Sequence, residues 1–348
     1  MTRTARLARY EADVVRQCRR GLDVGGMQRE VLRSLRRLMP IDAAFFATAD
    51  PDTLLFTGAY SEDPLAAASS LFMDNEFGGT DVNRFAALAC TPTHVASLDA
   101  ATRDDRAASS RYRDIMRPLG LGDELRAALV ADSVCWGFLC LHREDDPLGF
   151  TPSEAAALAR LGPYIAHGLR QAVLLHPPHT AGDVPRPGVV VLDENLDLVA
   201  ATSEAEHLLT MLPRGLRLPL PTPVYAVAAA LARPGGVPPS ARVQTRDGRW
   251  LDLHASRLAG AADAGRIAVV LEPAAPHAAA QILLAAYGLS PRERDLARLV
   301  LRGSSTRVIA GALHISAHTV QDHLKSVFDK VGVRSRRDLV GVLLGRPG

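Results

Sequence analysis

The chain has 348 residues, which is long enough for two or three domains. An apolar fraction of 47% and a formal net charge of +2 predict packed cores and exclude an extended disordered chain. The longest nearly uncharged apolar stretch, residues 224–232, is far shorter than the roughly 20 residues that cross a bilayer, and the charged N-terminus lacks the apolar run of a signal peptide. We therefore expect a cytoplasmic protein that does not enter the membrane. Four cysteines predict reduced thiols in cores and not a disulfide framework.

The first predicted domain covers residues 1–176. Its expected elements, in chain order, are helices at 6–19 and 27–38, strands at 43–49 and 54–60, helices near 64–72 and 109–116, and a hairpin of 124–131 with 135–142. The capping sequence Thr151-Pro152-Ser153-Glu154 predicts a closing helix that runs to about residue 174 with a kink at Pro163. An antiparallel sheet flanked by terminal helices resembles a GAF domain, and the resemblance implies a sensory function.

The sequence of this domain suggests two kinds of site. A small-molecule pocket is expected between the strand 135–142 and the segment 72–85, with Trp136 and Phe138 lining it, and the alternative is a fully packed core at these aromatics. Cys140 and His142 share a strand face near Cys135, which is compatible with a metal or haem site. A small buried cysteine beside a polar histidine is the favoured interpretation. We therefore expect no metal, no cofactor and no catalytic residue.

Two proline-rich breaks, at residues 176–187 and 272–276, delimit a second predicted domain of residues 177–276. Its expected elements are a hairpin of 188–192 with 196–201, a helix at 204–209, a hairpin of 242–245 with 250–255 across an Asp-Gly turn, and a strand at 267–271. This order is similar to a degenerate PAS domain. The proline-rich residues 212–238 are expected to replace the usual helical side of that fold, which puts a ligand pocket there in doubt.

The last predicted domain, residues 277–348, is all helical. Ser290-Pro291-Arg292-Glu293 combines a serine N-cap, a proline at the first helical position and a capping-box glutamate, so a helix begins there and ends near Gly303. A second helix is expected over 306–313. His314 then stands in a tight turn that favours positive φ, and Ser316 caps a third helix that runs to about residue 331.

The third helix of this domain has two distinct faces. Val320, Leu324, Val327 and Val331 form an apolar stripe, and the opposite face is polar. A polar face alone is typical of any solvated helix. Residues 291–348, however, contain 11 Lys and Arg against 5 Asp and Glu, and both lysines of the protein lie in this helix. A basic tail on an otherwise acidic chain predicts binding to a polyanion.

The C-terminal residues resemble a known family of DNA-binding domains. Leu289-Ser290-Pro291-Arg292-Glu293, Ile309-Ala310, Thr319-Val320, His323-Leu324-Lys325 and Val333-Arg334-Ser335-Arg336 are similar to the LuxR/FixJ-type DNA-binding domain. The resemblance implies a four-helix helix-turn-helix domain whose recognition helix reads the major groove of double-stranded DNA. Many members of this family have a lysine at the position that Gln321 occupies in this chain. The DNA-binding residues that we expect are Ser304, Ser316, His318, Thr319, Gln321, Asp322, Lys325, Arg334 and Arg336.

A fourth helix is expected after Ser335, and in the family this helix often pairs with its copy in a second subunit. This helix carries more apolar surface than the core of one small domain can cover. Leu339, Val340 and Leu343 are therefore predicted to form a homodimer contact. Docking on the upstream domains is the alternative. The related helix-turn-helix of sigma-factor region 4 would require a polymerase-binding region upstream, and the sequence contains none.

The expected fold class is therefore α+β, with GAF-like and PAS-like antiparallel-sheet domains before a helical DNA-binding domain. The expected function is transcription regulation by a dimer that responds to a small molecule or a protein partner, with RNA polymerase as a further partner. No receiver-like βα repeat is present, so phosphorelay is not expected. One alternative is a constitutive regulator whose sheet domains only dimerise. Another is an enzyme with an accessory DNA-binding tail, although no catalytic motif supports it.

Overall fold

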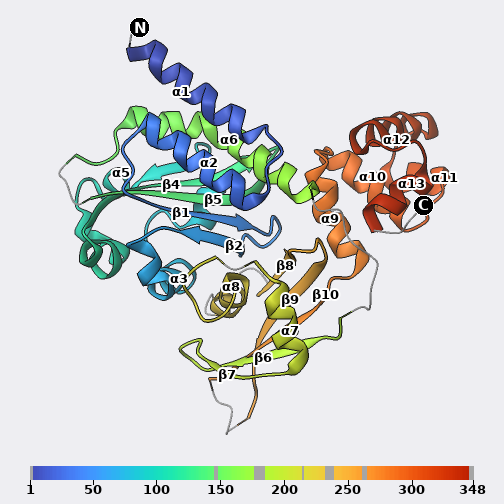
Figure 1. The fold of residues 1–348 in the computed structure, drawn as a ribbon. Coiled ribbons are helices and arrows are strands. Elements are labelled where there is room, and N and C mark those ends of the chain that lie inside the picture. The colour runs from blue at the N-terminus through green and yellow to red at the C-terminus, as the bar shows by residue number, and fades with distance from the viewer. Residues whose placement is uncertain are drawn as a thin grey trace.

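The computed structural model describes residues 3–144, 148–175, 185–213, 215–231, 239–260 and 265–344. These residues form two five-stranded antiparallel sheets, each packed against helices, followed by a group of helices at the C-terminal end (Figure 1). The fold class predicted from the sequence is confirmed. None of the helices in this part of the chain is both long and apolar enough to cross a membrane.

The first sheet has the strand order β2-β1-β5-β4-β3. Its strands are β1 (Ala43–Ala49), β2 (Phe56–Ser61), β3 (Val95–Ser97), β4 (Leu121–Ala131) and β5 (Val134–Glu144). Its larger helices are α1 (Arg3–Cys18), α2 (Val24–Leu38), α3 (Ser69–Gly78) and α6 (Pro152–Leu174), and its shorter ones are α4 (Phe85–Leu88) and α5 (Leu98–Thr102). Single turns occur at η1 (Leu65–Ala68), η2 (Arg106–Ala108), η3 (Tyr112–Met116) and η4 (Arg117–Leu119).

The two faces of this sheet are covered by different helices. Helices α1, α2 and α6 lie together over one face, where Phe46, Leu139 and Leu141 are buried (Figure 1). The other face carries Phe45 and Phe138, which pack with α3 and α4. Both faces are therefore interior, which explains why β4 and β5 are buried over most of their length.

The second sheet repeats the same antiparallel order, β7-β6-β10-β9-β8. Its strands are β6 (Gly188–Leu192), β7 (Leu198–Ala201), β8 (Ser240–Gln244), β9 (Trp250–Arg257) and β10 (Ile267–Pro273), and its helices are α7 (Ser203–Met211) and α8 (Thr222–Ala230). All five predicted strands of this domain are present. The first proline-rich break lies mostly outside the described residues, which resume at 185.

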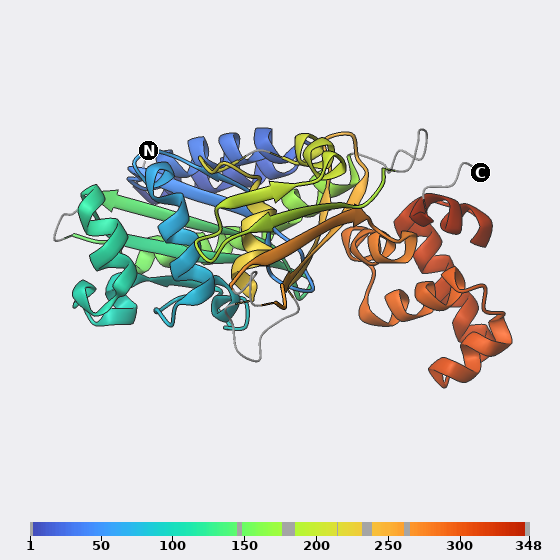
Figure 2. The ribbon, with the colours of Figure 1, turned by 90° about the horizontal axis from the view of Figure 1, so that it is seen from below.

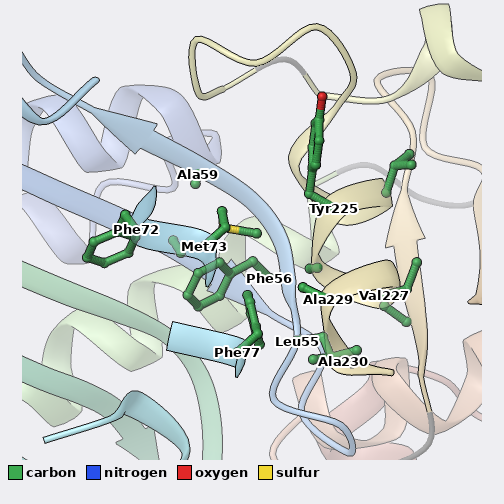
Figure 3. Close-up of a cluster of buried hydrophobic side chains, with 14 of the residues drawn as sticks. Leu55, Phe56, Ala59, Phe72, Met73, Phe77, Tyr225, Val227, Ala229 and Ala230 are labelled. Atoms are coloured by element: carbon green, nitrogen blue, oxygen red, sulfur yellow. The ribbon is translucent and has the colours of Figure 1, made fainter. Parts of the chain in front are cut away.

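Helix α8 joins the two sheet domains. Every residue of α8 is buried, as expected for a helix that is apolar on all sides. It packs on β9 of its own sheet and on β2 and α3 of the first domain. Figure 3 shows this junction, with Phe56, Met73 and Phe77 on one side and Tyr225 and Ala229 of α8 on the other. The proline-rich residues 212–238 were expected to replace the helical side of this domain, but α8 within them is a helix, and it fills the space between the two sheets.

The C-terminal helices are α9 (Pro276–Ala286), α10 (Pro291–Leu301), α11 (Thr306–Leu313), α12 (Ala317–Val331) and α13 (Arg336–Leu344). They lie together at one end of the molecule (Figure 2). The four predicted helices correspond to α10 to α13. Helix α9 was not predicted, because the proline-rich break at residues 272–276 was not expected to lead directly into a helix; residues 272 and 273 instead end β10, and α9 begins at Pro276.

Candidate DNA-binding surface and the interior of the first domain

The turn between α11 and α12 has the predicted geometry. His314 adopts a left-handed conformation with φ of 52°, and its backbone closes α11. Ser316 is the N-cap of α12, where its hydroxyl accepts a hydrogen bond from the backbone N–H of Thr319 at 3.0 Å. These two residues set the angle at which α12 leaves α11.

Helix α12 has a buried apolar face and an exposed polar face, as its sequence periodicity predicts. Val320, Leu324, Val327 and Val331 are buried against the other C-terminal helices. His318, Gln321, Asp322 and Lys325 are exposed on the outside, and the side chains of His318 and Asp322 are 89% and 68% exposed. The N-terminal half of α12 therefore presents hydrogen-bonding groups to solvent over about two turns. Thr319, also predicted at this site, is half-buried beside its cap.

Arg336 has a role that the sequence did not indicate. Its guanidinium donates to the backbone oxygen of Ser304 at 3.2 Å and to the hydroxyl of Thr306 at 2.8 Å. The amide of Gln321 reaches the same hydroxyl at 3.4 Å. Arg336 thus ties the start of α13 to the turn before α11, whereas Arg334 is exposed.

Glu293 connects α10 to the recognition helix and was recognised from the sequence only as a cap. Its carboxylate accepts from the backbone N–H of Ser290 at 2.7 Å, from the hydroxyl of Ser326 at 2.7 Å and from the ammonium of Lys330 at 2.6 Å. Burial favours a higher pKa for Glu293, but the bonds from Lys330, Ser326 and Ser290 outweigh it and lower the pKa to about 2. The two lysines of α12 therefore differ, since Lys330 holds the domain together and Lys325 faces outward.

The predicted dimer contact on α13 is corrected by the structure. Leu339 and Leu343 are buried in the core of the C-terminal helices, where α13 packs against α9. The expected surplus of apolar surface disappears because α9 supplies Ala280, Leu283 and Leu284 to this core. Val340 is half-buried, and Val342 remains 38% exposed.

Trp136 and Phe138, the two predicted ligand-binding residues, lie on opposite faces of the first sheet. Leu129 of β4 pairs with Gly137 and Val130 pairs with Cys135, so Trp136 is the extra residue of a β-bulge. A bulge reverses the alternation, and Trp136 consequently packs on the side of α6 while Phe138 faces α4. The structure therefore does not bring the two side chains into one pocket.

The space expected to hold a ligand beside Phe138 is filled by side chains. The rings of Phe85 and Phe138 stack with centroids 4.7 Å apart, and Phe45 and Phe56 pack around them. The Arg126 guanidinium lies 3.7 Å from the centre of the Phe85 ring and is paired with buried Glu76 at 2.7 Å. The face of the first sheet that carries Phe138 is therefore a packed core, which is the alternative to a ligand pocket that the sequence left open.

Cys140 and His142 lie on this face with Glu124, and their donor atoms are all within 4.8 Å of one another. Burial and the carboxylate of Glu124 raise the pKa of the Cys140 thiol well above 9. Burial lowers the pKa of His142 to about 4. Arg111, whose Nε is 2.8 Å from Glu124, adds positive charge to the cluster. A neutral thiol and a neutral imidazole beside two guanidinium groups form a poor site for a cation.

Comparison with known proteins identifies two regions of the chain. Residues 288–343 match the family model of bacterial regulatory proteins of the luxR family, and residues 24–169 match that of the GAF domain. The chain is 50% identical over 52 residues to an HTH-type transcriptional regulator of Mycobacterium bovis, which is 15% of this chain and 6% of that protein. The chain thus spans a small part of the first mycobacterial relatives.

Two further similarities differ in extent. The spore germination protein GerE of Bacillus subtilis is 38% identical over 56 residues, which is 16% of this chain and 76% of GerE. A solved structure of SdiA from Escherichia coli aligns over 97% of this chain and 98% of SdiA, with 13% identity and a TM-score of 0.35. The match to the family model and the similarity to most of GerE lead to the same conclusion. The chain belongs to the luxR family of bacterial regulatory proteins, and it carries a GAF domain before its DNA-binding helices.

Proposed function

We propose that this protein is a homodimeric transcription regulator that binds double-stranded operator DNA through α12 and responds to a small molecule or protein partner through its sheet domains. The exposed polar face on the N-terminal half of α12 is the observation that carries the proposal. It stands beyond a capped turn, in a tail with more basic than acidic residues. A helix presented in this way fits the major groove.

The individual contacts can be assigned by their chemistry. Gln321 offers a donor and an acceptor suited to adenine, and Lys325 suits guanine or a phosphate. Ser316, His318 and Thr319 at the start of α12 and Arg334 after it are placed to contact the DNA backbone. Ser304 and Arg336 belong to the bracing between α11 and α13, so we assign them a positioning role. The carboxylate of Asp322 repels phosphate, and it is suited to accept a hydrogen bond from the amino group of cytosine.

The proposed division of the chain is a GAF-like domain over 1–176, a PAS-like domain over 177–276 and a DNA-binding domain over 277–348. The hairpin, helix, hairpin and strand order of the second domain, with the same strand order as the first sheet, supports the PAS-like assignment. Helix α9 begins at Pro276 and contributes to the core of the C-terminal helices, which supports the last boundary.

A homodimer is proposed because a symmetric pair reads two half-sites with one recognition helix each. Val342 is exposed, and Val340 and Leu344 are the apolar positions of α13 that are partly exposed. RNA polymerase is a proposed partner of the bound dimer.

The function is tested by selecting binding sites from random duplex DNA with the full-length protein and footprinting the selected sequences. The expected result is a two-fold symmetric site whose half-sites are separated by about one helical turn of 10–10.5 base pairs. Selection of no preferred sequence at moderate salt would contradict the proposal. A symmetric site bound with the same affinity whatever effector is added would favour the alternative in which the sheet domains are only a dimerisation scaffold.

A further inference from the structure

A cavity of about 420 Å³ lies where the two sheet domains meet the helix that leads to the C-terminal domain. The first domain contributes the start of α2, the ends of β1 and β2 and the last turns of α6. The second domain contributes the β8–β9 hairpin, and α9 contributes Ile282. Its volume is in the range of small-molecule sites, which measure roughly 300–1,000 Å³. This cavity is on the opposite side of the first sheet from the packed aromatic core.

Both tryptophans of the protein line this cavity. Trp136 comes from the bulge of β5 and Trp250 from the start of β9, so each domain provides one indole. Both indole N–H groups are buried and have no hydrogen-bond partner among the described residues. An unpartnered buried donor is costly, and buried tryptophans usually find an acceptor for this group. An acceptor atom of a bound molecule would satisfy either donor when the indole turns its N–H from this buried position toward the cavity.

The remaining walls are mainly apolar or neutralised, and Arg246 of the β8–β9 hairpin, which is exposed to solvent, is the exception. Ala172 and Val173 of α6, Val243 of β8 and Ile282 are apolar. Arg242 is neutralised by Asp50 and Asp52, at 2.7 Å and 2.6 Å. Asp23 is engaged as the N-cap of α2, where it accepts from the backbone N–H of Gly26 at 2.6 Å.

The cavity also touches the element that connects input to output. Helix α9 has two buried faces, and Ile282, Ala285 and Ala286 pack in the core of the first domain beside Trp136 and Trp250. Ala280, Leu283 and Leu284, on the other face, pack in the core of the C-terminal helices. Figure 1 shows α9 between the sheet domains and the helices α10 to α13. A displacement of Ile282 would therefore shift side chains that support the DNA-binding core.

We propose that this junction cavity binds an uncharged, mainly apolar small molecule that carries carbonyl oxygens, and that its occupancy changes DNA affinity through α9. On binding, the two indoles turn their N–H groups toward the cavity, and the carbonyl oxygens accept hydrogen bonds from Trp136 and Trp250. The binding half of this inference stands by itself, and the regulatory half rests on the proposed function. Ligand control at this place requires different affinities for two arrangements of α9.

The binding test uses the full-length protein and two matched probes, 2-acetylnaphthalene and 2-ethylnaphthalene. Because both tryptophans line the cavity, quenching of intrinsic fluorescence reports on this site. We expect saturable binding of the ketone, with the hydrocarbon roughly fivefold weaker, since a neutral hydrogen bond corresponds to a factor of about two to twelve. Equal affinity for both probes, or no saturable binding of the ketone, would overturn the assignment.

Two substitutions locate the site. Trp136→Phe and Trp250→Phe keep an aromatic ring and remove the N–H, so each should weaken ketone binding several-fold while the melting temperature without probe stays equal or rises. Each single variant retains the other tryptophan as reporter. Phe85→Leu, in the aromatic core on the other face of the sheet, is the matched control and should leave ketone affinity unchanged. A loss of affinity in Phe85→Leu alone would place the ligand in that core instead.

The coupling test measures affinity for the selected DNA site with and without saturating ketone. We expect a change of about five- to 150-fold, the usual size of allosteric coupling, which is reduced in Ile282→Ala. Ketone binding without any change in DNA affinity would overturn the regulatory half. Absence of DNA binding under all conditions would contradict the proposed function and leave the cavity assignment in place.

Discussion

Arg242 of β8 and Asp50 at the end of β1 form a bidentate ion pair across the two sheet domains. The guanidinium Nε and Nη2 lie 2.9 Å and 2.7 Å from the two carboxylate oxygens, and the backbone N–H of Arg242 donates to the same carboxylate at 2.8 Å. Asp50 is buried. Burial favours a lower pKa for Arg242, but the bonds and charge of Asp50 outweigh it and raise the pKa above its ordinary value. The contact fixes one wall of the junction cavity.

Asp50→Asn should lower the free energy of unfolding by about 1.5–3 kcal/mol, because the largely buried guanidinium of Arg242 loses its bidentate partner and keeps only the exposed Asp52 as counter-charge. Chemical denaturation of the full-length protein measures this change. The control is Arg217→Lys, since Arg217 and Asp63 also pair between the two domains at 2.8 Å but are both exposed. A surface pair contributes about 0–1 kcal/mol. Equal effects of the two substitutions would show that the buried pair does not hold the junction.

Lys325→Ala should weaken binding to the selected DNA site and reduce the dependence of log affinity on log salt by about one unit if the ammonium meets a phosphate. If it meets guanine, base preference should change by about 1–3 kcal/mol instead. Affinities measured at several salt concentrations distinguish the two cases. Arg20→Ala removes one exposed positive charge from the segment after α1 and serves as the control. An unchanged affinity and salt slope in Lys325→Ala would remove this residue from the interface.

Glu293→Gln should destabilise the C-terminal helices by about 2 kcal/mol, because one carboxylate caps α10 and binds Ser326 and Lys330 of α12. The folded-state pKa of about 2 lies below the ordinary value of 4.5, so this stabilisation is complete above about pH 4.5 and is lost as the pH falls toward 2. Thermal unfolding followed by circular dichroism tests both points. Asp295→Asn, which breaks an exposed pair with Arg298 on the same helix, should have little effect.

Leu343→Glu should unfold the C-terminal helices, because it places a charge in the core between α13 and α9. Val342→Glu, one position earlier and partly exposed, should leave the helical content unchanged and weaken a dimer formed through α13. Circular dichroism reports folding, and sedimentation velocity reports the mass. A fully dimeric Val342→Glu protein would indicate that the dimer contact lies on another element.

The buried imidazole of His142 should lower the stability of the first domain in mild acid. The folded-state pKa of His142, about 4, lies below its ordinary value of 6.5, so the unfolded chain binds more protons between these two pH values. His142 alone should therefore lower the free energy of unfolding by up to about 1.4 kcal/mol per pH unit as the pH drops from 6.5 toward 4, against an opposite contribution from Asp123, whose pKa is raised by burial to about 6. His142→Leu should flatten this slope in urea titrations, and replacement of the exposed His207 of α7 should not. An unchanged slope in His142→Leu would contradict burial of a neutral imidazole.

Much of the local structure followed from the sequence because it depends on neighbours a few residues apart. The caps at Thr151, Ser290 and Ser316 all form as predicted, since each side chain satisfies a backbone N–H three residues later. The buried stripe of α12 follows from the helical period, and the hairpin of β4 and β5 follows from two largely apolar runs separated by a short turn. The short β3, from residues 95 to 97, was missed because three residues carry too little pattern.

What the tertiary structure decided involves residues far apart in the chain. The bulge moved Trp136 to the opposite face from Phe138, although two-residue spacing alone places both on one side. Helix α9 covered Leu339 and Leu343, and Asp50 met Arg242 across 192 positions. The junction cavity exists only because two sheets and α9 meet there. Periodicity states which side of an element is apolar, whereas the partner that covers this side is set by packing among all the elements together.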